Sequence, residues 1–202
     1  MSKTNSFWAN PSTSPKRKYR FLLSLPTLGS DASWMITKVN RPSFNVTEAT
    51  HSYLNHTFYF PGRVEWQTVS FTIVDPVTPD ATGMLMGVLG AAGYQIPANL
   101  AGNPGDSYGT MSKQAATEAM KLVKIRSINA KGDPADSWTL HNAWMKNVTM
   151  GDYDYSDDSL LSIDVELRYD FATYMVEKDG GTPSGQGTEA KIVAGYGKLN
   201  GL

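Results

Sequence analysis

The segment from Leu161 to Phe171 alternates between apolar and polar residues along its whole length. The apolar positions are Leu161, Ile163, Val165, Leu167, Tyr169 and Phe171, and the polar positions are Ser162, Asp164, Glu166, Arg168 and Asp170. Because successive side chains of a strand point to opposite faces, the pattern predicts one strand with a buried face and a polar face. Its length would be about 36 Å, well beyond that of a common strand. A chain with such a strand is expected to build an extended wall of sheet.

The chain of 202 residues is long enough for one domain that buries its own core. It contains no cysteine, which excludes disulfides and thiolate metal sites. Its first ten residues lack the apolar core of a signal peptide, and no apolar run approaches the roughly 18 residues of a membrane helix. We therefore expect a protein of an aqueous compartment.

Charge is unevenly distributed, although the net charge is only -1. Residues 1–20 carry a charge of +5, with no acidic residue, whereas residues 151–202 carry ten acidic and four basic residues, a charge of -6. A basic end and an acidic end favour head-to-tail contacts between copies, and two solvated tails would give the same pattern.

Turn-forming residues and alternation divide the chain into an N-terminal arm (1–17), a folded domain (18–176) and a C-terminal tail (177–202). Strands are expected at about 19–25, 34–39, 44–48, 53–60, 66–74, 121–129, 138–150 and 160–174, with a turn at Pro61-Gly62-Arg63. Helices are expected at 80–92, between a capping aspartate and Gly93, and in a shorter candidate at 111–119. The fold class is mainly β (α+β), a small antiparallel β-barrel or sandwich with one flanking helix and extended N- and C-terminal arms.

Residues that could form a catalytic or metal site do not converge. His51 and His56 are expected on opposite faces of extended chain, and His141 has no carboxylate near it in sequence. The acidic run from Gly151 to Ser159 lacks the glycine and the glutamate of a calcium-binding EF-hand loop, which favours a solvated turn. We expect no catalytic residue, no metal and no cofactor, and a protein that is not an enzyme.

The block Phe60–Asp75, FPGRVEWQTVSFTIVD, resembles a signature of the tail tube proteins of contractile-tailed phages, as in the T-even phages, a family related to the tube proteins of type VI secretion. Three further features fit the same family in the same order. They are Arg41-Pro42, the segment Trp144–Val148, and the strand Leu161–Tyr169.

The resemblance implies a structural virion protein. Copies would form stacked, hexameric rings of a hollow inner tube, the conduit through which DNA is ejected inside a contractile sheath. The implied partners are other copies, the sheath protein, baseplate and tail terminator proteins, and, transiently in the lumen, the tape measure protein and the genome DNA, with no membrane. The protein would be made in the host cytoplasm and would end in the virion tail.

Two groups of residues are candidates for these contacts. The polar face of the long strand would line an acidic lumen that repels DNA phosphates, or would face outward or be covered by a neighbour; its candidates are Asp164, Glu166, Arg168 and Asp170. The hairpin 50–63 would contact the next ring; its candidates are Tyr53, Phe58, Tyr59, Phe60 and Arg63.

The sequence is also compatible with two alternative functions. The tube subunit of a phage-like bacteriocin or of a type VI secretion machine would share the fold. A carbohydrate- or ligand-binding β-sandwich would use exposed tryptophans, with Trp34, Trp138 and Trp144 as candidates.

Overall fold

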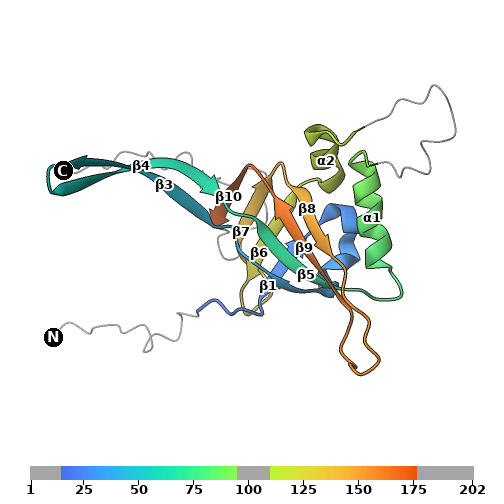
Figure 1. Cartoon of the computed structure of the whole chain (residues 1–202). Helices are drawn as coiled ribbons and strands as arrows, with labels where there is room; N and C mark the ends of the chain where they lie inside the picture. The colour runs from blue at the N-terminus through green and yellow to red at the C-terminus, as the bar shows by residue number, and fades with distance from the viewer. Residues whose placement is uncertain (1–14, 95–109, 177–202) are drawn as a thin grey trace, which may run out of the picture.

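A computed structural model describes residues 15–94 and 110–176 (Figure 1). The expected tail 177–202 and most of the expected arm 1–17 lie outside these residues. The described chain is mainly β, as expected, with ten strands in antiparallel sheets and two α-helices. Its two larger sheets are sandwich-like, and the described strands form no closed barrel.

Sheet A contains four strands in the order β1-β6-β7-β10. Their bounds are β1 Phe21–Ser24, β6 Val123–Ile128, β7 Pro134–His141 and β10 Phe171–Val176. Sheet B contains four strands in the order β2-β5-β9-β8. Their bounds are β2 Ile36–Val39, β5 Val69–Val74, β9 Ser162–Arg168 and β8 Trp144–Thr149. The third sheet is a separate hairpin of β3 (Phe44–Tyr53) and β4 (His56–Trp66).

The core lies where alternate residues of these strands turn inward. In sheet B, β5 buries Val69, Phe71 and Ile73, and its partner β9 buries the apolar positions of the alternating segment. Leu23 of β1 is among the inward residues of sheet A. The alternation therefore predicts correctly which side chains of β5 and β9 are buried.

Two helices pack at the end of the body away from the hairpin (Figure 1). Helix α1 (Ala81–Ala91) begins where the Asp80 carboxylate accepts a hydrogen bond from Gly83 N at 3.0 Å. Helix α2 (Lys113–Met120) has a serine cap of the same kind. Both helices lie where the sequence predicts helical segments, so two helices flank the sheets where the expected fold class has one.

The expected strand 160–174 is two strands, and this correction explains the architecture. The chain breaks at Tyr169-Asp170, so that β9 belongs to sheet B and β10 to sheet A. From β9 to Tyr169 the odd-numbered residues are buried, and past the break burial moves to an even-numbered residue. Phe171 is therefore exposed and Ala172 is buried. The bend cannot be predicted from the sequence, because apolar and polar residues alternate without interruption from Leu161 to Phe171.

The expected strand 138–150 divides in the same way, into β7 and β8. The break contains Asn142, whose φ of 55° lies in the left-handed region that asparagine tolerates. The β7–β10 pair and the β8–β9 pair are consecutive parts of one antiparallel ribbon, as His141 faces Phe171 and Trp144 faces Arg168. The ribbon bends once and gives one half to each sheet.

The expected turn at Pro61-Gly62-Arg63 is also wrong, because these residues lie inside strand β4. The hairpin reverses at Leu54-Asn55, where Leu54 has a φ of 54°. Pairing then runs from Tyr53↔His56 to Phe44↔Trp66. Trp66 ends β4, so the strand expected at 66–74 begins at Val69.

Candidate assembly surfaces

The β3–β4 hairpin projects from the body and has almost no buried residue (Figure 1). Its exposed large apolar side chains are Phe44, Val46, Tyr53, Leu54, Phe58, Tyr59, Phe60 and Val64. An isolated two-stranded sheet is marginally stable in water, and an exposed apolar patch of this kind marks an interaction surface. The hairpin has the properties of a surface that another molecule covers.

A β-bulge interrupts the hairpin near its middle. Val46 faces Val64 and Glu48 faces Pro61, so Thr47 alone lies opposite Gly62 and Arg63. The Thr47 hydroxyl accepts a hydrogen bond from Arg63 N at 2.8 Å. A side chain at position 62 would have no room, since a Cβ there would lie 2.8 Å from the Thr47 carbonyl oxygen. The Pro-Gly-Arg sequence thus forms a bulge, for which glycine is needed.

The bulge moves the apolar side chains from one face of the hairpin to the other. Directly paired residues share a face, so near the body Phe44, Val46, Val64 and Trp66 lie together. Beyond the bulge, this face carries the paired residues Thr50 and Tyr59. The opposite face gathers the aromatic residues of the tip, namely Tyr53, His56, Phe58 and Phe60.

The candidate ring-contact residues are therefore divided. Tyr53, Phe58 and Phe60 share the tip face, which we call the aromatic tip face together with His51 and His56. Tyr59, 67% exposed, lies on the other face, and Arg63 lies in the bulge.

Both hairpin histidines lie on the aromatic tip face. The register places His51 opposite Phe58 and His56 opposite Tyr53. The expectation of opposite faces is wrong because the turn at Leu54-Asn55 lies between the two histidines and reverses the chain. His56 packs edge-on against Phe58, with ring centroids 4.7 Å apart.

Aromatic contacts hold the root of the hairpin to the body. The Trp66 ring lies 5.4 Å from the Phe44 ring and 6.0 Å from the Tyr169 ring, centroid to centroid. Tyr169 is buried at the bend of the ribbon, and this burial raises the pKa of its phenol to about 12. The root is thus packed against the point where the ribbon passes from sheet B to sheet A.

The outward face of sheet B carries three of the four lumen candidates. Asp164, Glu166 and Arg168 alternate with the buried residues of β9. The Thr72 hydroxyl donates to Asp164 Oδ1 at 2.5 Å, and Lys146 Nζ lies 3.2 Å from Glu166 Oε1. A hydrogen bond from Thr68 and then the one from Lys146 hold the Glu166 pKa below its usual value. This face is polar and of mixed charge, whereas the sequence suggested an acidic one.

The fourth lumen candidate, Asp170, lies apart from these three, at the bend of the ribbon. Its carboxylate accepts hydrogen bonds from Lys113 Nζ at 2.7 and 2.8 Å and from Asn142 Nδ2 at 2.8 Å. These contacts, that of Lys113 first, lower the Asp170 pKa. In this structure Asp170 joins α2 to both breaks of the ribbon.

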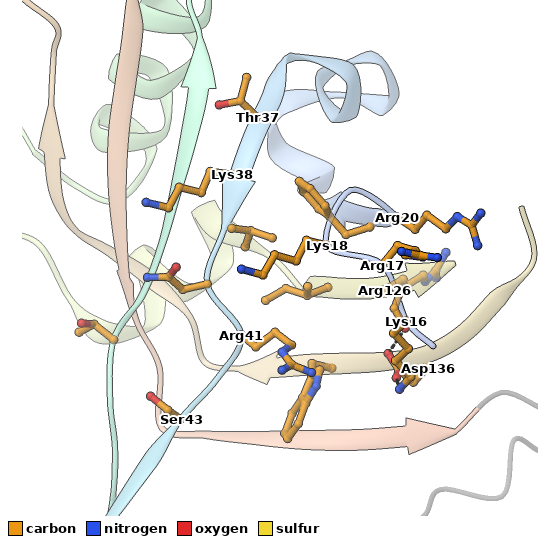
Figure 2. A pocket seen from close by; sticks show the side chains of 17 residues that line it. Lys16, Arg17, Lys18, Arg20, Thr37, Lys38, Arg41, Ser43, Arg126 and Asp136 are labelled. Atoms are coloured by element: carbon orange, nitrogen blue, oxygen red, sulfur yellow. Dashed lines mark hydrogen bonds and ion pairs between the residues drawn. The ribbon is translucent and has the colours of Figure 1, made fainter. Parts of the chain in front are cut away.

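A basic groove of about 760 Å³ lies near the hairpin root, between β1, β6 and β7 of sheet A and β2 of sheet B (Figure 2). Seven cationic side chains and one acidic side chain line it. The cations are Lys16, Arg17, Lys18, Arg20, Lys38, Arg41 and Arg126, and the acid is Asp136.

Asp136 is a buried carboxylate, only 5% exposed, with several donors. It accepts hydrogen bonds from the Ser127 and Tyr174 hydroxyls and pairs with Lys16 Nζ. Asp136 therefore neutralises Lys16. Among the described residues, none of the other six cations makes an ion pair.

The groove was not predicted from the sequence, in which only the basic charge of residues 1–20 points to it. Lys38 and Arg41 are distant from that segment in sequence. They join it because β1 and β2 are the edge strands of their two sheets. To predict the groove from the sequence, one would have to know the order of the strands in both sheets.

The three tryptophan candidates for a ligand site lie in different settings. Trp138 pairs with Ile125 in sheet A and packs against Tyr174, with ring centroids 4.8 Å apart. Trp144 is paired with Arg168 on sheet B, and Trp34 lies in the 3-10 helix Ser30–Met35.

Within residues 15–94 and 110–176, no three histidine, aspartate or glutamate side chains gather where they could hold a metal ion. The described helices include none that is both long and apolar enough to cross a membrane.

Comparison with solved structures relates the fold to contractile injection systems. A chain of the anti-feeding prophage cap, the AFP tube terminating cap, superimposes with a TM-score of 0.57 and 16% identity, over 81% of this chain and 93% of that chain. A chain of the PVC sheath-tube complex, from an extracellular contractile injection system, gives a TM-score of 0.56 and 15% identity, over 82% and 95% of the two chains. A chain of the AFP baseplate gives a TM-score of 0.55 and 16% identity, over 81% and 97%.

No protein-family model matches the chain, and no curated protein matches it. The structural likeness extends over nearly the whole of the compared chains, so this protein has the tail-tube-like fold of contractile injection systems. The resemblance to tail tube proteins is confirmed at the level of the fold.

Proposed function

We propose that this chain is a non-enzymatic structural subunit whose copies form rings that stack into the inner tube of a contractile tail. The observation that carries the proposal is the β3–β4 hairpin, whose apolar side chains are exposed on both faces. Burial of apolar surface in a neighbouring copy is the simplest way to stabilise such a hairpin. Head-to-tail contacts between unlike surfaces close into rings or extend into filaments, as a stacked tube requires.

The aromatic tip face and Tyr59 form the proposed contact with the next ring. Because the bulge places apolar side chains on both faces, one hairpin can contact two neighbours at once. Asp164, Glu166 and Arg168 form the proposed lumen surface, since all three lie on the outward face of sheet B. A polar wall of mixed charge lets a cargo pass without binding it tightly.

The proposed setting is a phage tail, in which the tube binds the sheath on its outside, the baseplate and terminator at its ends, and the tape measure protein and DNA in its lumen. The likeness to injection-system chains supports an equally direct alternative, the tube of a phage-like bacteriocin or of a secretion machine. Co-purification of nucleic acid with tubes from infected or induced cells distinguishes the phage tail from these alternatives.

Electron microscopy of the purified protein over a concentration series tests the assembly. We expect rings or hollow tubes of uniform width for the wild-type chain. A Phe58→Ser, Phe60→Ser variant, which removes two rings from the aromatic tip face, should remain monomeric with an unchanged Tm. The matched control is Val77→Ser, Met86→Ser, which removes two exposed apolar side chains outside the hairpin. A wild-type chain that stays monomeric at high concentration, also with a baseplate or preformed tube as nucleus, would exclude the proposed function.

A further inference from the structure

We propose that the basic groove receives the acidic β8–β9 loop of a neighbouring copy. The inference rests on the proposed function, because it supplies a second contact between copies besides the hairpin. It starts from the six groove cations that have no ion-pair partner among the described residues, namely Arg17, Lys18, Arg20, Lys38, Arg41 and Arg126. Like charges gathered in one hollow repel each other, so an anionic occupant stabilises the groove.

One of the groove cations, Arg126, has a buried hydrogen-bond donor without an acceptor. The Arg126 Nε–H group is buried and donates to no hydrogen-bond acceptor in the described chain. A buried donor without an acceptor costs free energy, so the Arg126 side chain, which lines the groove, is a cation that lacks a full set of acceptors. Asp136 cannot serve the other cations, because its oxygens are taken by Lys16, Ser127 and Tyr174.

The β8–β9 loop, residues 150–161, offers the complementary charge. Its four carboxylates are exposed and belong to Asp152, Asp154, Asp157 and Asp158. Two of them also fix the shape of the loop, since Asp154 accepts from Ser156 N and Asp157 accepts from Ser159 N, both at 2.9 Å. These hydrogen bonds lower the pKa of both aspartates and keep them ionised.

The loop and the groove of one molecule lie at opposite ends of sheet B. The loop leads into β9 at Ser162, and Ser162 pairs with Val74 at one end of β5. The groove is lined by Arg41, Ser43 and Thr68, next to the other end of β5. Figure 1 shows the loop projecting away from the sandwich and away from the hairpin root. The loop is therefore presented to a second molecule.

This arrangement gives a head-to-tail contact. The hairpin root and the basic groove lie at one end of sheet B, and the acidic loop lies at the other. Two copies in the same orientation along an axis bring these ends together, as stacked rings require. Nucleic acid is the weaker occupant, because the chain has a net charge of -1 and the cations surround one hollow rather than forming an extended stripe.

Charge exchange tests the contact. Lys38→Glu, Arg41→Glu in the groove and Asp152→Lys, Asp158→Lys in the loop, two positions that make none of the hydrogen bonds shaping the loop, should each raise the protein concentration needed for assembly by about tenfold or more. The two sets combined in one chain should restore assembly, because each groove then meets a loop of opposite sign. Lys131→Glu, an exposed charge reversal in the β6–β7 turn, is the matched control.

The absence of native cysteine allows a direct test of proximity. Under mild oxidation a Lys38→Cys, Asp152→Cys chain should form a ladder of disulfide-linked multimers on a non-reducing gel. Each single-cysteine chain can reach no further than a dimer, and an equal mixture of the two should give mainly mixed dimers. As a control, thermal unfolding of each variant is measured to show that every chain in the comparison is folded.

The outcomes separate this inference from the proposed function. If wild-type tubes form and the charge exchange neither weakens nor restores assembly, or no ladder appears, the groove does not hold the loop, although the tube proposal stands. If the groove variants assemble normally and instead lose binding to a labelled oligonucleotide, the groove is a nucleic-acid surface and the inference is overturned. If the wild-type chain forms no assembly under any condition, both proposals fall.

Discussion

Asn142 Nδ2 donates a hydrogen bond to Asp170 Oδ2 at 2.8 Å, which joins the two breaks of the bent ribbon to each other. Asn142 lies between β7 and β8, and Asp170 lies between β9 and β10. Asp170 N also donates to the His141 carbonyl at 3.1 Å, so the backbone pairing continues through the bend. Lys113 of α2 completes the junction by pairing with the same carboxylate.

This junction predicts a pH-dependent contribution to stability. The Asp170 pKa is lowered in the folded chain, so its contribution is present above the unfolded pKa of about 3.9 and is lost as pH falls through the folded value. Because Lys113 and Asp170 are partly exposed, Asp170→Asn should lower the free energy of unfolding by only about 1 kcal/mol at pH 7. Chemical denaturation at pH 7 and below pH 3 measures the effect. The Asp158→Asn variant is the control, and a loss that persisted unchanged at the lower pH would contradict the electrostatic origin.

The bulge predicts a position where a small change disrupts the hairpin. Gly62→Val places a side chain against Thr47, whose carbonyl oxygen would lie 2.8 Å from the new Cβ, so the strands must separate. Assembly should be lost, while near-ultraviolet circular dichroism of the body remains that of the wild type. Gly90→Ala in α1 is the control, since nothing lies within 4 Å of its added Cβ, and it should stabilise the helix by about 0.5 to 1 kcal/mol. Normal tubes from Gly62→Val would show that the bulge has no part in assembly.

Core and hairpin phenylalanines should differ sharply in their effect on stability. Phe71 of β5 is 1% exposed in the core, so Phe71→Ala should cost about 3 to 5 kcal/mol in the free energy of unfolding. Phe60 of the hairpin is 55% exposed, and Phe60→Ala should change that free energy by no more than about 0.5 kcal/mol. Urea denaturation of the dilute monomer measures both values. Equal costs would mean that the hairpin is packed against the body in solution.

The polar face of sheet B predicts the position of a label in assembled tubes. In assembled tubes, an Asp164→Cys chain labelled with a maleimide-linked gold cluster should show gold density on the lumen side of the tube wall in averaged electron micrographs. Wild-type tubes have no cysteine to react and serve as the control. Gold density on the outer radius would assign this face to the sheath side.

Sequence reasoning succeeded where a pattern depends on neighbouring residues. Alternation identified the buried side chains of β5 and β9, and capping residues located α1. It failed where the geometry depends on partners distant in sequence. The bend at Asp170 needs Asn142 and Lys113, and the bulge at Gly62 needs Thr47; none of these pairs has a local signature.

The candidate sites show the same division. Composition was enough to single out the aromatic hairpin, but the faces of Tyr59 and His51 depend on the turn and the bulge. The basic groove required the order of strands in both sheets, because only that order brings Lys38 and Arg17 to the lining of one groove (Figure 2).

The β3–β4 hairpin also determines how a newly made copy behaves before it joins others. Within the described chain this sheet has only two strands, so each strand keeps one edge of backbone donors and acceptors open to the solvent. Such an edge can pair with any extended chain that it meets, correct or not. A free monomer is thus the form with the most backbone open to wrong pairing, and the proposed contact with the next ring would remove that risk by covering the hairpin.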